Sequence, residues 1–303
     1  MAVAFFAATS GAVAEDDVVR LIDELEHGPP SAQNHAIERL RFIGASLAGP
    51  HLRRMLDSPE PDLRVRASAA LAVVADAGSL TALEEAVSDE DWEVRRNAAD
   101  ALRLLRKRSS TRVLSARLRV EKNPLVRRSC VRALGAVGGG GASLVSVAIH
   151  DPETETRLAA LHEIARMMDA KSAHAVRSLL GDPTTLVQFA AARSMAWSGE
   201  EAGIDFLSRA LGSKDADARR RAVTALSDCP RPRCVELLHR ALEMADSSAP
   251  AAEALARRGD ARGLAWLAKR ATGENPESRW ADRVLQELGY DVRQRAALMR
   301  GAP

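Results

Sequence analysis

A repeat of about thirty-one residues runs through the chain and constrains its fold more than any other feature. An apolar anchor returns nine times, 29 to 32 residues apart, at Leu40, Leu71, Leu102, Leu134, Ile164, Met195, Leu226, Leu255 and Leu285. A small residue precedes each anchor by four positions, at Ala36, Ala67, Ala98, Cys130, Ala160, Ala191, Ala222, Ala251 and Ala281. Residues four apart share one face of a helix, so we expect each anchor and its small partner to lie in a core where neighbouring helices approach closely.

Each repeat also contains an earlier apolar run, about nineteen residues before the anchor. Its members recur at a spacing of four, in the pairs Leu52–Leu56, Leu83–Val87, Val145–Ile149, Val176–Leu180 and Leu207–Leu211. Turn and capping signals such as Asn123-Pro124 separate the two runs. Each repeat is therefore predicted to be a pair of helices. A single pair cannot bury its apolar face, so the pairs must stack into an all-α solenoid of about nine repeats over residues 15–289.

The second helices follow one template, hydrophobe-Arg-x-x-small-x-x-x-Leu, at residues 94–102, 126–134 and 218–226. With the Asp-Pro turns, this template resembles HEAT repeats, in particular the short variety of phycobilisome-lyase-type HEAT proteins. The resemblance implies a right-handed superhelix with second helices on its concave side, and a hydrogen-bonded ladder between turn acids and template arginines. It gives this role to Asp91 with Arg95 and to Asp215 with Arg219. Four units lack the arginine and should have a weaker ladder, at Gln33, Gln188, Ser248 and Ser278.

Two details of the repeat remain open. In the second unit, Leu63-Arg64 leading to Leu71 and Val65-Arg66 leading to Val73 both satisfy the template. The run of glycines at residues 138–141 falls at a turn between repeats, where it is either a helix-ending signal or a flexible joint.

The N-terminal and C-terminal segments and the cysteines indicate the cellular compartment. Residues 1–14 are small and apolar and resemble the end of a signal peptide, but no basic residue precedes Arg20, so we interpret them as a leader or a frayed N-terminus. Residues 290–303 form a C-terminal tail. Three cysteines exclude a disulfide-stapled scaffold and favour a reducing, cytoplasmic compartment, with secretion possible if residues 1–14 are a signal peptide. No stretch approaches the ~20 apolar residues that cross a bilayer, so we expect no membrane partner.

Catalytic and metal-binding signatures are missing from the sequence. The seven histidines do not form a zinc-binding pair beside a glutamate, and no Gly-rich phosphate loop occurs. Cys229 and Cys234 would suit a metal or redox site only if two further ligands met there, and we prefer small core residues. Deoxyhypusine hydroxylase, an enzyme with similar repeats, carries several His-Glu pairs, whereas this chain has only His162-Glu163, late in its helix. We therefore expect no enzymatic activity, no metal and no cofactor.

Arginines gather on the side of the second helices opposite the anchors. Helical-wheel positions on that side hold Arg96, Asp100, Arg103, Leu104, Arg128, Arg132, Leu158, His162, Arg166, Phe189, Arg193, Trp197, Arg220 and Asp228. Residues 1–92 hold 7 basic and 16 acidic residues, whereas residues 93–132 hold 13 basic and 3 acidic residues. Solvated arginines on helices would explain part of this pattern. Like charges on neighbouring helices repel, however, so a one-signed surface favours an anionic partner.

The function predicted from this pattern is a non-catalytic interaction scaffold. It would bind an acidic protein or peptide along a concave surface made by Arg96, Arg103, Arg128, Arg132, Leu158, Arg166, Phe189, Arg193, Trp197 and Arg220. Phe189 and Trp197 lie eight residues apart on one helix face, with Leu158 expected beside Phe189, and would form an apolar anchor. The same arginines could bind nucleic-acid backbone, and the family resemblance alone leaves a phycobilin-lyase-like enzyme or subunit as a further alternative.

Overall fold

The computed structural model describes residues 15–43, 45–74, 77–273 and 275–291, together with residues 294, 297 and 298. Contacts divide the chain into two compact units, Met1–Glu163 and Ile164–Pro303, which are described separately below. The leader predicted at residues 1–14 and most of the tail predicted at residues 290–303 lie outside the described residues. No helix in the described part of the chain is long and apolar enough to cross a membrane.

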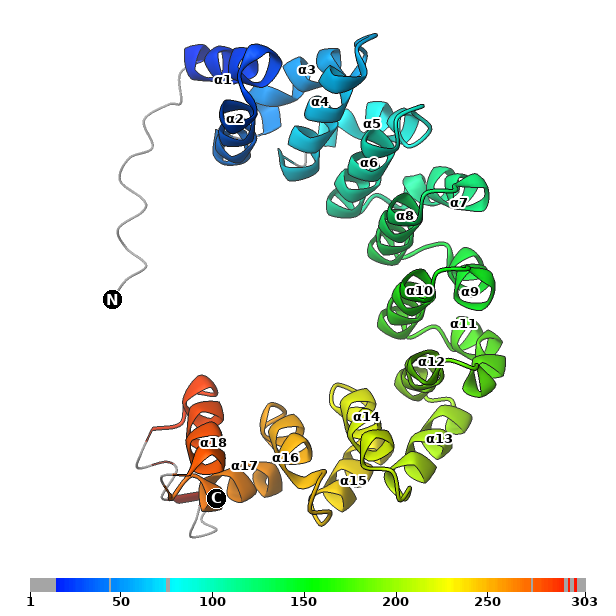
Figure 1. Cartoon of the computed structure of the whole chain (residues 1–303), viewed down its shortest axis with the longest axis vertical. Helices are drawn as coiled ribbons and strands as arrows, with labels where there is room; N and C mark the ends of the chain where they lie inside the picture. Colours follow the sequence, from blue (N-terminus) through cyan, green and yellow to red (C-terminus); the bar gives the residue numbers. More distant parts are fainter. Residues whose placement is uncertain are drawn as a thin grey trace. The chain divides into compact units, whose positions relative to one another are not determined.

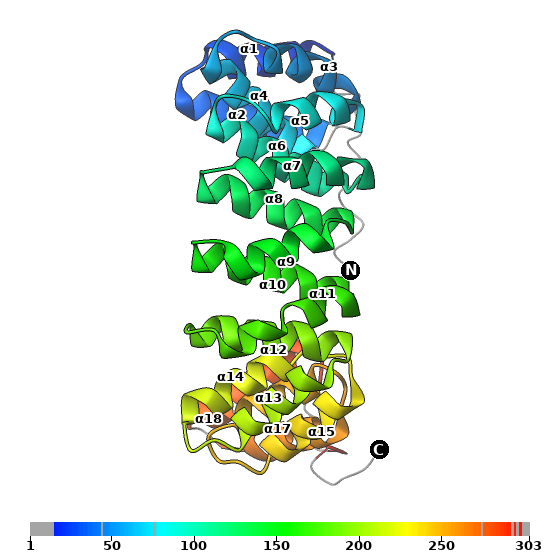
Figure 2. The same ribbon diagram turned by 90° about the vertical axis from the view of Figure 1, so that its right-hand side faces the viewer.

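The first unit is a stack of helix pairs coloured blue to green in Figure 1. Its helices are α1 (Glu15–His27), α2 (Pro30–Ile43), α3 (Ala45–Leu56), α4 (Pro61–Val74), α5 (Leu80–Ala86), α6 (Trp92–Leu105), α7 (Thr111–Val120), α8 (Pro124–Val137), α9 (Gly141–His150) and α10 (Thr154–Met167), the last of which crosses the boundary between the units. Short 3-10 helices at Ala77–Ser79 and Arg108–Ser110 precede α5 and α7. Helices α2, α4, α6 and α8 pack in succession as a second-helix layer, and α3, α5, α7 and α9 form a first-helix layer, which faces the viewer in Figure 2.

The second unit repeats this arrangement. It contains α11 (Ala170–Ala175), a 3-10 helix (Arg177–Gly181), α12 (Thr185–Ser198), α13 (Glu201–Leu211), α14 (Ala216–Leu226), α15 (Pro232–Ala241), α16 (Ser248–Ala256), α17 (Ala261–Arg270) and α18 (Pro276–Glu287). Helices α12, α14 and α16 pack in succession, as do α13 and α15. Both units are therefore α-helical solenoid segments built from the predicted pairs.

The repeat positions predicted from sequence form the core. All nine anchors are at most 1% exposed, and all nine small residues four positions earlier are 0% exposed. Capping side chains begin several second helices as predicted: Asp91 accepts hydrogen bonds from the backbone of Glu93 and Val94, and Asn123 accepts one from Leu125. Because the anchor side is buried in every repeat, the opposite side of each second helix faces outward or contacts the next helix.

The structure resolves both open details. In α4, Arg64 is buried and Arg66 is half-buried, so the frame that ends at Leu71 is correct. The glycine run ends α8, with left-handed Gly138 (φ 69°) and Gly140 (φ 75°). A Cβ on Gly139 would overlap the Thr111 hydroxyl, so this turn is a closely packed helix end rather than an unconstrained joint.

The first-helix pattern is wrong by one residue in α9. Val145 and Ile149 were predicted to face the core, but they are half-buried, whereas Leu144 and Ala148 are 0% exposed. Leu144–Ala148 and Val145–Ile149 are both apolar pairs spaced by four residues, so helical periodicity alone does not distinguish the two registers.

Candidate functional site

The clearest candidate surface lies on α6 and α8 in the first unit, opposite their core sides. Val94, Ala98 and Leu102 of α6 are at most 1% exposed. Positions on the other side of the helix carry Arg96 and Asp100, which remain half-buried at the surface. The same positions on α8 carry further arginines, and α6 packs directly against α8. We call this side of α6 and α8 the second-helix face.

Template arginines seven positions before the anchors are not part of this face. In the first unit, three of them bind an acid of the next repeat, in the pairs Arg64–Asp89, Arg95–Glu121 and Arg127–Asp151. Arg157 instead donates to the carbonyl of Asp151 in its own turn. The Nε atoms of Arg95 and Arg127 lie 2.8 Å from their partner carboxylates. Each acid in turn accepts a backbone N–H of its own turn, as Glu121 does from Asn123. The ladder predicted from the family resemblance is therefore present.

The acidic partners predicted for the arginine ladder were wrong. Asp91 does not pair with Arg95 but caps α6, and Arg95 binds Glu121, which is 26 residues later. Asp215 likewise caps α14, while Arg219 pairs with Asp246. The guanidinium group of Arg95 lies at the N-terminal turn of its own helix, where Nη1 donates to the carbonyls of Asp89 and Glu90. Its Nε and Nη2 remain free for an acid of the following repeat, and these bind Glu121. Gln188, at a template position without arginine, bonds only to the carbonyl of Asp182 in its own turn, 2.6 Å away.

The ladder fixes the charge state of its members. Burial would raise the pKa of Glu121, but hydrogen bonds from Arg95, the Asn123 N–H and Arg117 hold it at about 2. The hydrogen bond that Arg127 donates to Asp151 raises the pKa of Arg127, against the effect of burial. These arginines are neutralised inside the protein, which leaves the arginines of the second-helix face as a separate group.

Arg96, Arg103 and Arg132 surround the carboxylate of Asp100. Burial raises the pKa of Asp100, and Arg103, the Ser129 hydroxyl, Arg96 and Arg132 each oppose that rise. The Asp100 carboxylate lies 3.9 Å from Arg103. Arg96 lies 3.9 Å from Glu93 and stacks 5.3 Å from the ring centroid of Trp92. Three predicted site residues therefore meet at one half-buried acid.

Arg128 and Arg132 differ from Arg96 and Arg103. Arg132 is exposed and Arg128 is half-buried, and neither forms an ion pair or a side-chain hydrogen bond with any residue that the structure describes. With Arg96 and Arg103 they give the second-helix face four arginines against Asp100 and Glu93. This part of the predicted site is brought together by the fold.

Three other predicted residues are placed but not joined to this group. Leu158 of α10 is half-buried, and Arg166, near the end of α10, is exposed and belongs to the second unit. Arg220 of α14 is exposed and pairs with Asp217 on its own first turn, so its charge is partly compensated. The expectation that Leu158 lies beside Phe189 connects the two units and stays a prediction.

The prediction that Phe189 forms an exposed anchor is wrong. Phe189 is 8% exposed, and its ring packs edge-on against Phe206 of α13, with centroids 5.3 Å apart. A helical wheel gives only the direction of the Cα–Cβ bond, whereas the long aromatic side chain reaches the helix of the next repeat. Burying a phenylalanine contributes about 1.5–3 kcal/mol, which favours this packing over exposure.

Trp197 remains at the surface of the second unit, half-buried. The guanidinium of Arg193 stacks 4.6 Å from the centroid of its ring and lies 3.9 Å from Asp228. Burial lowers the pKa of Arg193, and Asp228 opposes that change. The indole N–H of Trp197 and the Nε of Arg193 are buried without a hydrogen-bond partner in the described structure. Arg193 and Trp197 therefore act as one stacked unit, separate from Phe189.

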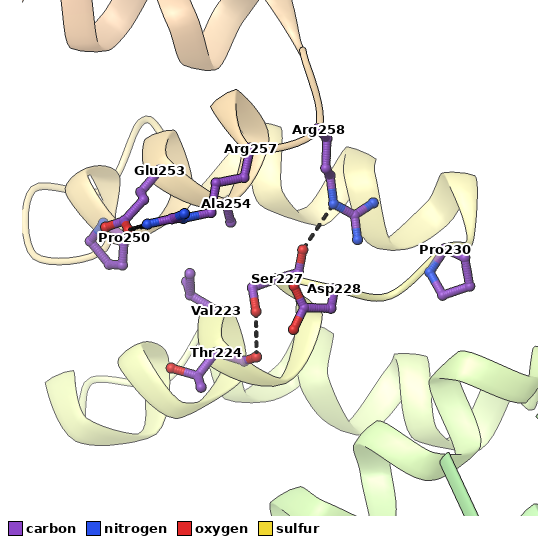
Figure 3. Close-up of a pocket in the computed structure, with 10 residues that line it drawn as sticks. All are labelled: Val223, Thr224, Ser227, Asp228, Pro230, Pro250, Glu253, Ala254, Arg257 and Arg258. Atoms are coloured by element: carbon purple, nitrogen blue, oxygen red, sulfur yellow. Dashed lines mark hydrogen bonds and ion pairs between the residues drawn. The ribbon is translucent and has the colours of Figure 1, made fainter. Parts of the chain in front are cut away.

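A pocket of about 550 Å³ opens between α14 and α16 (Figure 3). Arg258 crosses its wall and donates from Nε to the carbonyl of Ser227, 2.8 Å away, and Arg257 binds Glu253. Asp228 also lines it. None of the residues predicted for the binding surface lines this pocket, because the predicted surface ends at the seventh repeat. The same positions in the eighth repeat would have included Arg257.

The structure also places the candidate metal ligands and the three cysteines. In the described residues, no group of three or more His, Cys, Asp or Glu side chains could hold a metal ion. Cys229 and Cys234 are both 0% exposed, as expected of core residues, but they are joined by a disulfide that the sequence analysis did not predict. Cys130 is a buried free thiol, and burial raises its pKa to about 12.

Paired helices, small residues at the packing positions and an arginine ladder between turns define an α solenoid. The profile of HEAT repeats matches residues 49–135 and 141–227, and the chain belongs to the HEAT-repeat proteins. A search of curated proteins finds no match.

Several solved structures are similar to this chain, and the first of them supports the fold. The X-ray structure of YibA from Escherichia coli has a TM-score of 0.57 at 15% identity and covers 79% of this chain and 91% of its own. An engineered protein has a TM-score of 0.48 at 20% identity, covering 92% and 96% of the two chains. The CpcE–CpcF complex of phycocyanin lyase from Nostoc has a TM-score of 0.39 at 19% identity, covering 94% and 98%. At these identities the likeness concerns the fold alone.

Proposed function

We propose that this protein is a non-catalytic scaffold that binds an acidic protein or peptide on the second-helix face of α6 and α8. The observation that carries the proposal is the set of four arginines on this face, of which Arg96, Arg103 and Arg132 act on the charge of Asp100. Arg128 and Arg132 form no ion pair or side-chain hydrogen bond with any described residue. Arginine can hold a carboxylate through two parallel hydrogen bonds.

The arginines fall into two groups, one that joins repeats and one that lies on the second-helix face, and this difference supports the proposed function. Arg95 and Arg127 already hold the repeats together through buried carboxylates. The arginines of the second-helix face make no comparable contact between repeats, and their mutual repulsion costs free energy in the unbound protein. An acidic partner would remove that cost. In the second unit, Trp197 rather than Phe189 is the aromatic side chain that a partner could contact.

The test is a binding titration with a fluorescently labelled peptide rich in Glu and Asp. The double variant Arg128→Glu/Arg132→Glu should weaken binding about tenfold or more, which corresponds to at least 1.4 kcal/mol. The matched control is Arg112→Glu/Arg119→Glu, which reverses two exposed arginines of α7 in the first-helix layer. The control should bind the peptide within about twofold of the wild type.

Two results would overturn the proposal. One is wild-type protein that does not bind the acidic peptide even at about 1 mM, the weak limit of specific recognition. The other is an equal loss of affinity in both double variants, which would indicate unspecific attraction. Circular dichroism should show unchanged helicity for both double variants. The substituted arginines, at positions 112, 119, 128 and 132, make no ion pair within the described residues.

A further inference from the structure

A second basic surface lies on the first-helix layer, along α7 and the two turns that flank it. Residues 103–132 contain 11 basic residues and one acidic residue, with no Phe, Tyr or Trp. Six of the cations belong to this surface and all are exposed: Arg106, Lys107, Arg108, Arg112, Arg119 and Lys122. We call these six residues the α7 strip. The first-helix layer that carries α7 faces the viewer in Figure 2.

Two of the six cations share one face of the helix. Arg112 and Arg119 are seven residues apart, which places them about 10 Å apart along the axis and within about 20° of each other around it. Arg106, Lys107 and Arg108 precede the helix, and Lys122 follows it. Exposed cations therefore occur along α7 and at both of its ends.

These cations are not neutralised within the protein. None of the six forms an ion pair or a side-chain hydrogen bond with a residue that the structure describes. The only acid in this stretch, Glu121, is 7% exposed and is bound by Arg95 and Arg117. At the α6–α7 corner, Glu84 of α5 accepts hydrogen bonds from the hydroxyls of Ser109 and Ser110. The next first helix, α9, has no acidic residue.

We infer that the α7 strip binds the phosphate backbone of a double-stranded nucleic acid. A row of unpaired Arg and Lys side chains matches a dense, regular array of phosphates, which they contact without reading the bases. A protein partner would need an apolar or aromatic anchor, and Val120, 65% exposed, is the one large apolar residue exposed on α7 itself among the residues that the structure describes. The lack of aromatic residues also excludes the base stacking on which single-strand binders depend.

This inference concerns a different face from the proposed function and does not depend on it. Three of the four arginines of the second-helix face act on the charge of Asp100, whereas the one acid beside the α7 strip, Glu121, is already bound by Arg95 and Arg117. The double variants Arg128→Glu/Arg132→Glu and Arg112→Glu/Arg119→Glu therefore test peptide binding and duplex binding separately.

The experiment measures binding of labelled DNA and RNA duplexes of arbitrary sequence as a function of salt. If all six cations contact phosphates, the plot of log K against log salt should have a slope of about −5. The variant Arg112→Ala/Arg119→Ala should reduce the magnitude of the slope by about 2 and weaken binding about tenfold or more at moderate salt. The control Arg128→Ala/Arg132→Ala should retain the wild-type slope.

Single-stranded DNA and lipid vesicles test whether the α7 strip prefers a ligand other than a duplex. Single-stranded oligothymidine should bind more weakly than either duplex. Preference for the DNA or the RNA duplex identifies the natural source, and binding of either supports the inference. The inference is overturned if neither duplex binds, if the α8 control loses binding while the α7 variant keeps it, or if only phosphatidylserine vesicles bind. Thermal unfolding should be unchanged in the α7 variant, because Arg112 and Arg119 form no ion pair or side-chain hydrogen bond within the described structure. The same measurement shows whether the α8 control is folded.

Discussion

At the residue scale, one amino-acid type serves two purposes according to its place in the repeat. Arg95, seven residues before its anchor, is 9% exposed and bonds to Glu121 of the next repeat. Arg96, the next residue, lies on the second-helix face. A step of one residue turns a side chain by about 100° around the helix, which moves it from a buried ladder to the surface.

Phe189 and Trp197 show a similar contrast, which can be tested. Phe189→Ala should lower the free energy of unfolding by about 3 kcal/mol, because it leaves a cavity beside Phe206. Trp197→Ala should cost less, since half-burial and stacking on Arg193 involve fewer lost core contacts. Urea unfolding followed by circular dichroism measures both. A larger loss for Trp197→Ala would show that the two aromatic residues have been assigned the wrong roles.

At the scale of elements, the ladder connects the turn of one repeat to the second helix of the previous one. Asp89, Glu121 and Asp151 each bind an arginine and also order their own turn. The pairs are largely buried, so removal of either partner leaves a charge without compensation. The packing of successive repeats therefore depends on the ionisation of these acids.

This dependence predicts an acid-labile contribution from Glu121. Its pKa is lowered from 4.5 to about 2 in the folded protein, so its ionisation stabilises the fold above pH 4.5, and that contribution is lost as the pH falls toward 2. Glu121→Gln should therefore be less stable than the wild type at neutral pH and should lose less additional stability between pH 4.5 and 2. Chemical unfolding at several pH values measures this.

Glu85→Gln provides the control for that measurement. Glu85 is exposed on α5 and has no ion-pair partner among the described residues. Its variant should follow the wild-type dependence on pH. If Glu121→Gln and the wild type lose equal stability over this range, the carboxylate of Glu121 does not carry the acid sensitivity.

At the scale of the whole molecule, repeats contact mainly their neighbours, so damage should remain local. Arg127→Ala leaves Asp151 buried without its partner and should lower the free energy of unfolding by about 3–5 kcal/mol. Hydrogen exchange measured by mass spectrometry should accelerate in α7 to α9, on both sides of the broken contact, and not in α14 to α18. Uniform acceleration along the chain would instead indicate a single cooperative unit.

Charge is also distributed unevenly over the molecule. The net charge of +2 combines an acidic stretch, residues 1–92, with a basic stretch, residues 93–132. The structure divides the basic stretch between two layers of the first unit: the second-helix face of α6 and α8, and the α7 strip. Two anionic partners could therefore bind without competing for the same side chains.

Local signals in the sequence are sufficient to predict the repeat, the helix pairs and the core. Helical periodicity and the recurring small residues are local signals, so they located all nine anchors, from Leu40 to Leu285, at buried positions. They also placed Arg96, Arg103, Arg128 and Arg132 on one side of α6 and α8, because a helical wheel follows from the backbone alone.

Tertiary structure decided which distant groups meet. Three features depend on where neighbouring elements lie. These are the pairing of the ladder arginines with Glu121 and Asp246, the burial of Phe189 against Phe206, and the register of α9. The Cys229–Cys234 disulfide and the pocket between α14 and α16 have the same origin. A one-dimensional pattern specifies the direction in which a side chain leaves its own helix, whereas its contacts depend on the length of that side chain and on the packing of the next repeat.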